Sequence, residues 1–76
     1  MPTFSIHIVN SDFVSSSSVD APSSEAARSE ALRGALRIGA EEVCKGNLFF
    51  AAEIRIQSGD ETIERLVVAI GASALQ

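Results

Sequence analysis

One stretch of this chain, Ser23 to Lys45, has both the length and the pattern of a long helix, and it constrains how everything else can fold. A step of about 100° per residue places small and apolar residues on one broad arc and charged residues opposite them. The arc holds Ala27, Ala31, Leu32, Ala35, Leu36, Ile38, Gly39, Ala40 and Val43, and the opposite side holds Glu30, Arg33, Arg37 and Glu41. The pattern predicts a helix with one buried face, on which the rest of the chain packs.

Residues at the two ends of this stretch are typical of helix boundaries. Ser23 follows Pro22 and is suited to accept a hydrogen bond from the first turn. Gly46 follows Lys45 and tolerates the left-handed conformation that often ends a helix. Because Gly39 lies on the apolar arc and has no side chain, we expect the closest approach of the helix to its neighbours there.

The chain before the helix predicts one strand and a short return strand. Residues 3–9 alternate with a period of two, which sends Phe4, Ile6 and Ile8 to one face. Asn10-Ser11-Asp12 has turn chemistry, so residues 13–15 are expected to return as a short second strand. The polar segment 15–22 is expected to be a connector into the helix.

The chain after the helix predicts a longer hairpin. One strand runs over residues 48–57, a turn follows at 58–61, and the partner strand covers 62–70. The favoured register sets Ile54 opposite Leu66 and Ala52 opposite Val68, since this makes one continuous apolar face. The alternative, shifted by one residue, would bring Arg55 opposite Glu64. In the strand over residues 48–57, the apolar face consists of Phe50, Ala52, Ile54 and Ile56.

These elements follow one another in the order ββαββ, which predicts an α+β fold. Its simplest compact form is a two-layer sandwich, a four-stranded antiparallel sheet with one long helix on one face. We expect residues 1–76 to form a single domain, with 71–76 as a short tail that forms at most one frayed helical turn.

Composition narrows the class of protein. The hydrophobic fraction is 46%, but no apolar run reaches the roughly 18 residues that would cross a bilayer. The N-terminus lacks the pattern of a signal peptide. Cys44 is the single cysteine, which excludes an intramolecular disulfide and is typical of a reducing compartment. The sequence therefore predicts a cytoplasmic protein with no membrane association.

The start of the helix carries a family resemblance. Pro22-Ser-Ser-Glu-Ala-Ala-Arg-Ser-Glu-Ala-Leu32 resembles the helix opening of a family of short bacterial proteins, a domain of unknown function of about the same length. The Met-Pro start, the first strand and the hairpin over 50–70 are similar to that family too. What the resemblance implies is a fold and a size class.

No catalytic, cofactor or metal site is predicted. His7 is the sole histidine and lies on the strand face opposite the expected core, without a predicted nucleophile or orienting group. Glu41, Glu42 and Glu53 fit solvated surface positions, and no small-molecule ligand is evident. The formal net charge of −4 disfavours a nucleic-acid-binding domain, because phosphate binding needs a continuous basic surface.

The remaining function class is protein binding. One helix covers only one face of the sheet, and the other face is expected to carry a row of apolar residues: Val9, Phe49, Ala51, Val67 and Ala69. The sequence therefore predicts a non-catalytic protein-protein interaction module that forms a homodimer through this face or an edge strand. The alternative is an acidic, antitoxin-like regulator that binds a basic partner protein.

Overall fold

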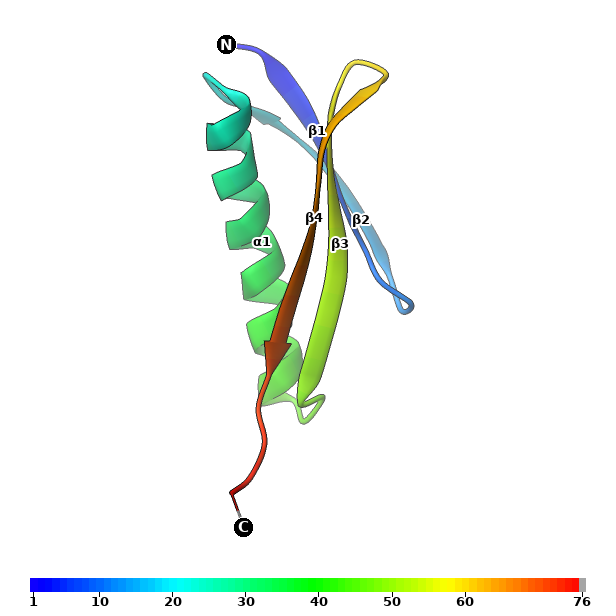
Figure 1. Ribbon diagram of the computed structural model, residues 1–76, viewed down its shortest axis with the longest axis vertical. Helices are drawn as coiled ribbons and strands as arrows, with labels where there is room; N and C mark the ends of the chain where they lie inside the picture. Colours follow the sequence, from blue (N-terminus) through cyan, green and yellow to red (C-terminus); the bar gives the residue numbers. More distant parts are fainter. Residues whose placement is uncertain (76) are drawn as a thin grey trace.

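The structure is a computed structural model that describes residues 1–75 and contains four strands and one helix (Figure 1). The elements are β1 (Thr3–Val9), β2 (Val14–Asp20), α1 (Ser24–Cys44), β3 (Phe49–Ser58) and β4 (Glu61–Gly71). All four strands form one antiparallel sheet in the order β2-β1-β3-β4. Figure 1 shows α1 along one side of the sheet, so the predicted ββαββ order and α+β fold are confirmed.

The core lies between α1 and one face of the sheet. The strand alternation predicted from the sequence is confirmed, because the buried strand residues are Phe4, Ile6, Ile8, Phe50, Ala52, Ile54, Ile56 and Val68. From the helix side, the buried residues are Ala27, Ala31, Ala35 and Gly39. Their spacing of four residues forms a stripe of small side chains along α1, which lets the helix backbone lie close to the strands.

The close approach at Gly39 is confirmed, whereas the predicted buried arc is too broad. A Cβ added at Gly39 would lie 2.5 Å from Ile70 Cδ1 and 2.7 Å from Phe50 Cδ2. Leu36 and Ala40 were predicted to be buried, but both are exposed, Leu36 to 46%. A helix held close to a sheet by small residues contacts it along a narrow stripe, so side chains at the margin of the arc stay in solvent.

Both predicted helix boundaries are confirmed. The Ser23 hydroxyl accepts a hydrogen bond of 3.2 Å from the Ala26 backbone N–H at the start of α1. At the other end Gly46 has φ +110°, and its N–H donates to the Val43 carbonyl at 3.1 Å. The next N–H, that of Asn47, donates to the Glu42 carbonyl at 3.0 Å, which completes a Schellman-type end.

The prediction of a connector over 15–22 was wrong, because residues 15–20 belong to strand β2. The whole of β2 pairs with β1, with Val19 opposite Phe4 and Ser17 opposite Ile6. Serine has little intrinsic preference for strands, but pairing with β1 satisfies the backbone groups on the inner side of β2 whatever the side chains are, and its other side is an edge of the sheet. The Thr3 hydroxyl also donates to Asp20 Oδ1 at 2.7 Å, where β1 begins and β2 ends.

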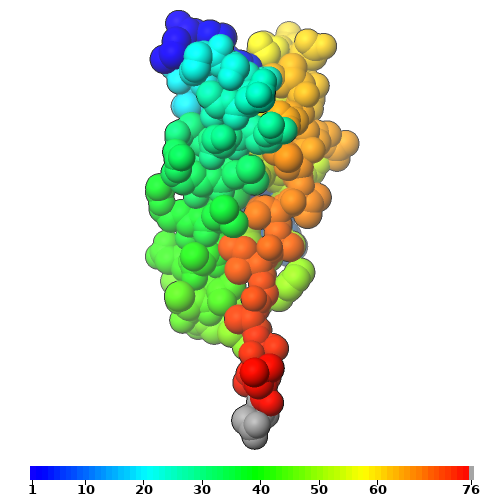
Figure 2. All heavy atoms as spheres, turned by 60° about the vertical axis from the view of Figure 1, so that its left-hand side comes forward, coloured from blue at the N-terminus to red at the C-terminus, as the bar shows by residue number. Residues whose placement is uncertain are grey.

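The second hairpin has the favoured register. Ile54 is opposite Leu66 and Ala52 opposite Val68, and a bulge next to Ile56 shifts the pairing near the turn. Beyond β4, residues 72–75 have no regular structure, so the helical turn predicted in the tail is absent there, and Gln76 lies outside the described residues. Figure 2 shows this tail projecting beyond the body of the molecule. Within residues 1–75, no helix has the length and apolarity needed to cross a membrane.

Candidate interaction surface

The face of the sheet away from α1, here called the open face, has an apolar end. Strand pairing places Val9 opposite Glu53, Glu53 opposite Val67, and Ala51 opposite Ala69, so all of these side chains share one face. Phe49 and Val67 are 72% and 77% exposed. The predicted interface residues are therefore brought together on one surface. This apolar end comprises Val9, Val14, Phe49, Ala51, Val67 and Ala69.

Val14 belongs to the apolar end although the sequence analysis did not include it. It is 68% exposed and pairs directly with Val9 across the β1–β2 hairpin. The signal was present in the sequence, because residues 13–15 were expected to form a return strand next to residues 3–9. The register that sets Val14 against Val9 became visible only in the paired hairpin.

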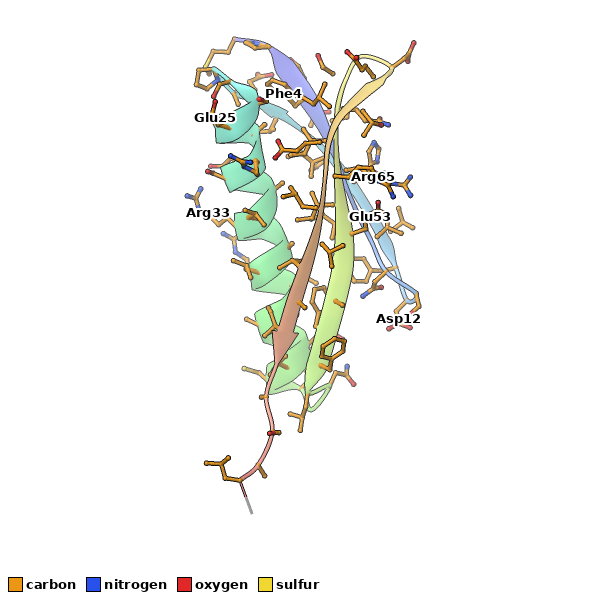
Figure 3. All side chains as sticks on the ribbon, viewed as in Figure 1. Phe4, Asp12, Glu25, Arg33, Glu53 and Arg65 are labelled. Carbon is orange, nitrogen blue, oxygen red and sulfur yellow. The ribbon has the colours of Figure 1, made fainter. Side chains whose placement is uncertain are left out.

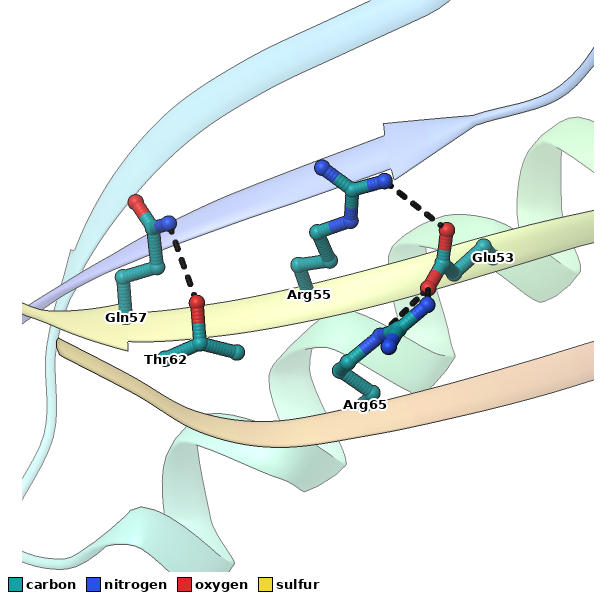
Figure 4. A network of polar contacts seen from close by, with 5 residues as sticks. All are labelled: Glu53, Arg55, Gln57, Thr62 and Arg65. Carbon is teal, nitrogen blue, oxygen red and sulfur yellow. Dashed lines mark hydrogen bonds and ion pairs between the residues drawn. The ribbon is translucent and has the colours of Figure 1, made fainter.

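The middle of the open face is held together by a carboxylate between two arginines (Figure 4). Glu53 Oε2 lies 2.7 Å from Arg65 Nε and 2.5 Å from Arg65 Nη2, and Glu53 Oε1 lies 3.2 Å from Arg55 Nη2. Arg55 and Arg65 are directly opposite each other, so Glu53 offsets the repulsion between them. The hydrogen bonds from Arg65, and then those from Arg55, lower the pKa of Glu53 below its ordinary value of 4.5.

The far end of the open face is polar and centres on His7. Its Nε2 lies 3.2 Å from Gln57 Oε1, and its Nδ1 lies 2.9 Å from Ser16 Oγ. Because an amide oxygen only accepts, Nε2 donates to Gln57 in this arrangement, and the direction of the hydrogen bond between Nδ1 and the serine hydroxyl follows the state of the ring. Gln57 Nε2 in turn donates to Thr62 Oγ1 at 3.2 Å, so one polar chain crosses all four strands.

The Ser16–His7 contact has the distance of a nucleophile and its base, but neither residue lines either of the two hollows at the Phe49 end of the sheet. Cys44 is exposed at the end of α1, and Glu41 is exposed on the same helix. No group of three or more metal-ligating side chains is found among residues 1–75. The arrangement around His7 therefore has the character of a cross-strand hydrogen-bond network.

A hollow of about 610 Å³ lies beside the apolar end of the open face. It is bordered by the β1–β2 turn at residues 10–13, by Glu42 near the end of α1, and by residues 47–53. The rings of Phe13 and Phe50 stack at its border with a centroid distance of 6.3 Å. Figure 3 shows Asp12 at the tip of this turn, and Glu53 and Arg65 on the side of the sheet away from α1.

No family model, curated protein or solved structure matches this chain. The resemblance of the helix opening to short bacterial proteins therefore stays a prediction, and function has to be argued from the surface itself.

Proposed function

We propose that this protein is a homodimeric protein-protein interaction module whose interface is the apolar end of the open face. The observation that carries the proposal is the exposure of Phe49 and Val67, 72% and 77%, within one contiguous group of apolar side chains. Soluble monomers rarely leave such a group in water, and aromatic residues supply much of the energy of interfaces.

The proposal includes a non-catalytic role in the cytoplasm. The free thiol of Cys44 is consistent with a reducing compartment. The alternative of an acidic regulator gains no support from the open face, because its central carboxylate, Glu53, lies between Arg55 and Arg65. A basic partner would need a different surface, and a second copy is the better candidate for this one.

Sedimentation velocity at tens of micromolar tests the dimer. We expect the wild type to sediment as a dimer and Phe49→Glu and Val67→Lys to sediment as monomers, because each variant introduces a charged, strongly hydrated side chain into the apolar interface. Circular dichroism should show unchanged secondary structure, since both side chains lie away from the core.

The matched control is Leu36→Glu, which introduces a charge at an exposed apolar position on α1. This variant should remain dimeric. A wild type that sediments as a monomer would contradict the proposal. Loss of the dimer in Leu36→Glu, with folding intact, would show that the interface lies on the helix and not on the sheet.

A further inference from the structure

β3 is an inner strand of the sheet, yet part of it lacks a neighbour on one side. β1 ends at Val9, which pairs with Glu53, whereas β4 pairs with β3 as far as Phe49. Residues 49–52 therefore have β4 on one side and no strand on the other, a segment here called the β3 notch. Figure 1 shows β3 and β4 extending beyond the tip of the β1–β2 hairpin.

The alternation of an antiparallel sheet identifies the backbone groups that point into the notch. The Ala72 N–H donates to the Leu48 carbonyl at 2.8 Å. Leu48 and every second residue after it therefore direct their backbone N–H and C=O groups toward β4. Phe49 and Ala51 then direct their N–H and C=O groups to the opposite side. Among the described residues, neither has a backbone hydrogen bond to a turn or loop there.

The notch opens onto the hollow of about 610 Å³ described above. Four residues of a strand span about 13 Å, so the notch can pair with a short extended segment. Its walls provide apolar contacts, with Phe49 exposed on the open face and the half-buried ring of Phe13, which stacks on the buried Phe50, at the border of the hollow. Unpaired backbone beside apolar walls is the arrangement that accepts an added strand.

Charge around the hollow indicates which segment fits. Asp12, Glu42 and Glu53 border it, and no lysine or arginine is among its lining residues. Glu53 is paired with arginines and Glu42 lies 3.6 Å from Lys45 Nζ, while Asp12 has no ion pair in the described part of the chain. A second copy in the notch would bring its own carboxylates against these, whereas lysine or arginine side chains would complement them.

We propose that the β3 notch binds an extended segment of a partner protein, with alternating apolar and basic side chains, as an added strand. The apolar residues of the segment contact Phe49 on the open face, and its basic residues lie near Asp12 and Glu42 at the border of the hollow. This site pairs through the backbone edge of β3, but it shares Phe49 and Ala51 with the surface proposed for the dimer, so the peptide and a second copy would compete for these residues.

Fluorescence anisotropy with a labelled peptide of alternating valine and lysine tests the proposal, and a valine-glutamate peptide of equal length is the control. We expect saturable binding of the first peptide and none of the second. On saturation, amide hydrogen exchange at Phe49 and Ala51 should slow. Absence of saturable binding at millimolar protein, equal binding of both peptides, or unchanged exchange at these two amides would each overturn the proposal.

Two variants locate the site. Asp12→Asn combined with Glu42→Gln should weaken binding by about two- to thirtyfold, the range expected for two exposed ion pairs. The control, Asp60→Asn with Glu61→Gln, removes the same charge from the β3–β4 turn and should bind like the wild type. Equal weakening in both double variants would mean that peptide binding depends only on the net charge of the protein, and it would overturn the proposed site.

Ala51→Pro tests the backbone pairing because it removes the N–H that points into the notch. It should lower peptide affinity at least tenfold. Unchanged affinity in a folded Ala51→Pro would overturn the strand addition. Protection of the Phe49 and Ala51 amides in a peptide-free wild-type dimer would show that a second copy occupies the notch, which would also overturn the proposal. If the variant does not fold, amide exchange in the wild type decides.

Discussion

At the scale of single residues, two glycines of the same helix should respond in opposite ways to alanine. Gly39→Ala is expected to lower the free energy of unfolding by about 1–3 kcal/mol, because the buried ring of Phe50 lies 2.7 Å from the added Cβ and cannot easily move. Gly34→Ala is expected to raise it by about 1 kcal/mol, since helix propensity improves and the nearest atom, Ile8 Cδ1, is 3.9 Å away. Urea denaturation measures both. Equal effects would contradict the close packing at Gly39.

Glu53 gives the second prediction at this scale. Its lowered pKa means that the ionised carboxylate is favoured in the folded state. The stabilisation is therefore complete above the ordinary value of 4.5 and is lost as the pH falls through the lower, folded-state pKa. Glu53→Gln should reduce the free energy of unfolding at neutral pH, and the difference from the wild type should shrink in acid.

A side-chain NMR titration of Glu53 separates its two partners. Arg65→Gln should raise the Glu53 pKa more than Arg55→Gln does, because Arg65 makes the shorter contacts and is the larger cause of the lowered pKa. The reverse order would contradict the geometry of this cluster.

At the scale of the elements, two leucines one helical turn apart test how α1 meets the sheet. Leu32 is half-buried against the core, while Leu36 is 46% exposed. Leu32→Ala should cost about 2 kcal/mol, toward the low end for buried leucine, and Leu36→Ala less than about 1 kcal/mol. Chemical denaturation of the two variants decides the matter. A larger loss for Leu36→Ala would mean that the helix is rotated relative to this description.

β2 shows why an element can be missed in a sequence. Its residues from Ser15 to Ser18 are all serine, which removes the apolar alternation that reveals β1 and β3. Pairing with β1 supplies the missing information, because an antiparallel neighbour pairs with the backbone groups on one side of β2 whatever its side chains are. The chain thus forms a strand from a segment that, by composition, resembles a loop.

At the scale of the whole molecule, the decisive feature is one helix on a four-stranded sheet. A small domain buries a limited fraction of its surface, and a second copy on the open face would add to its stability. The β3 notch arises at the same scale, because β1 ends before β3 does.

The sequence by itself determined the local features. Alternation in residues 3–9 and 50–57 was sufficient for the faces of β1 and β3, and the Ser23 and Gly46 boundaries followed from the chemistry of helix ends. The register of the β3–β4 hairpin was also predictable, because only one alignment of the apolar residues makes a continuous face. Each of these depends on residues that are close in the chain or opposite each other in one hairpin.

Tertiary structure decided what depends on contacts between distant segments. The close approach of Gly39 to Phe50 and Ile70 decided which residues at the edge of the helix arc are exposed. The position of β1 between β2 and β3 decided three further features. These are the strand β2 itself, the contact of Val14 with Val9, and the His7 network across four strands. Periodicity records which side of an element faces the core, but only the packed sheet fixes which elements are neighbours and where one strand extends beyond another.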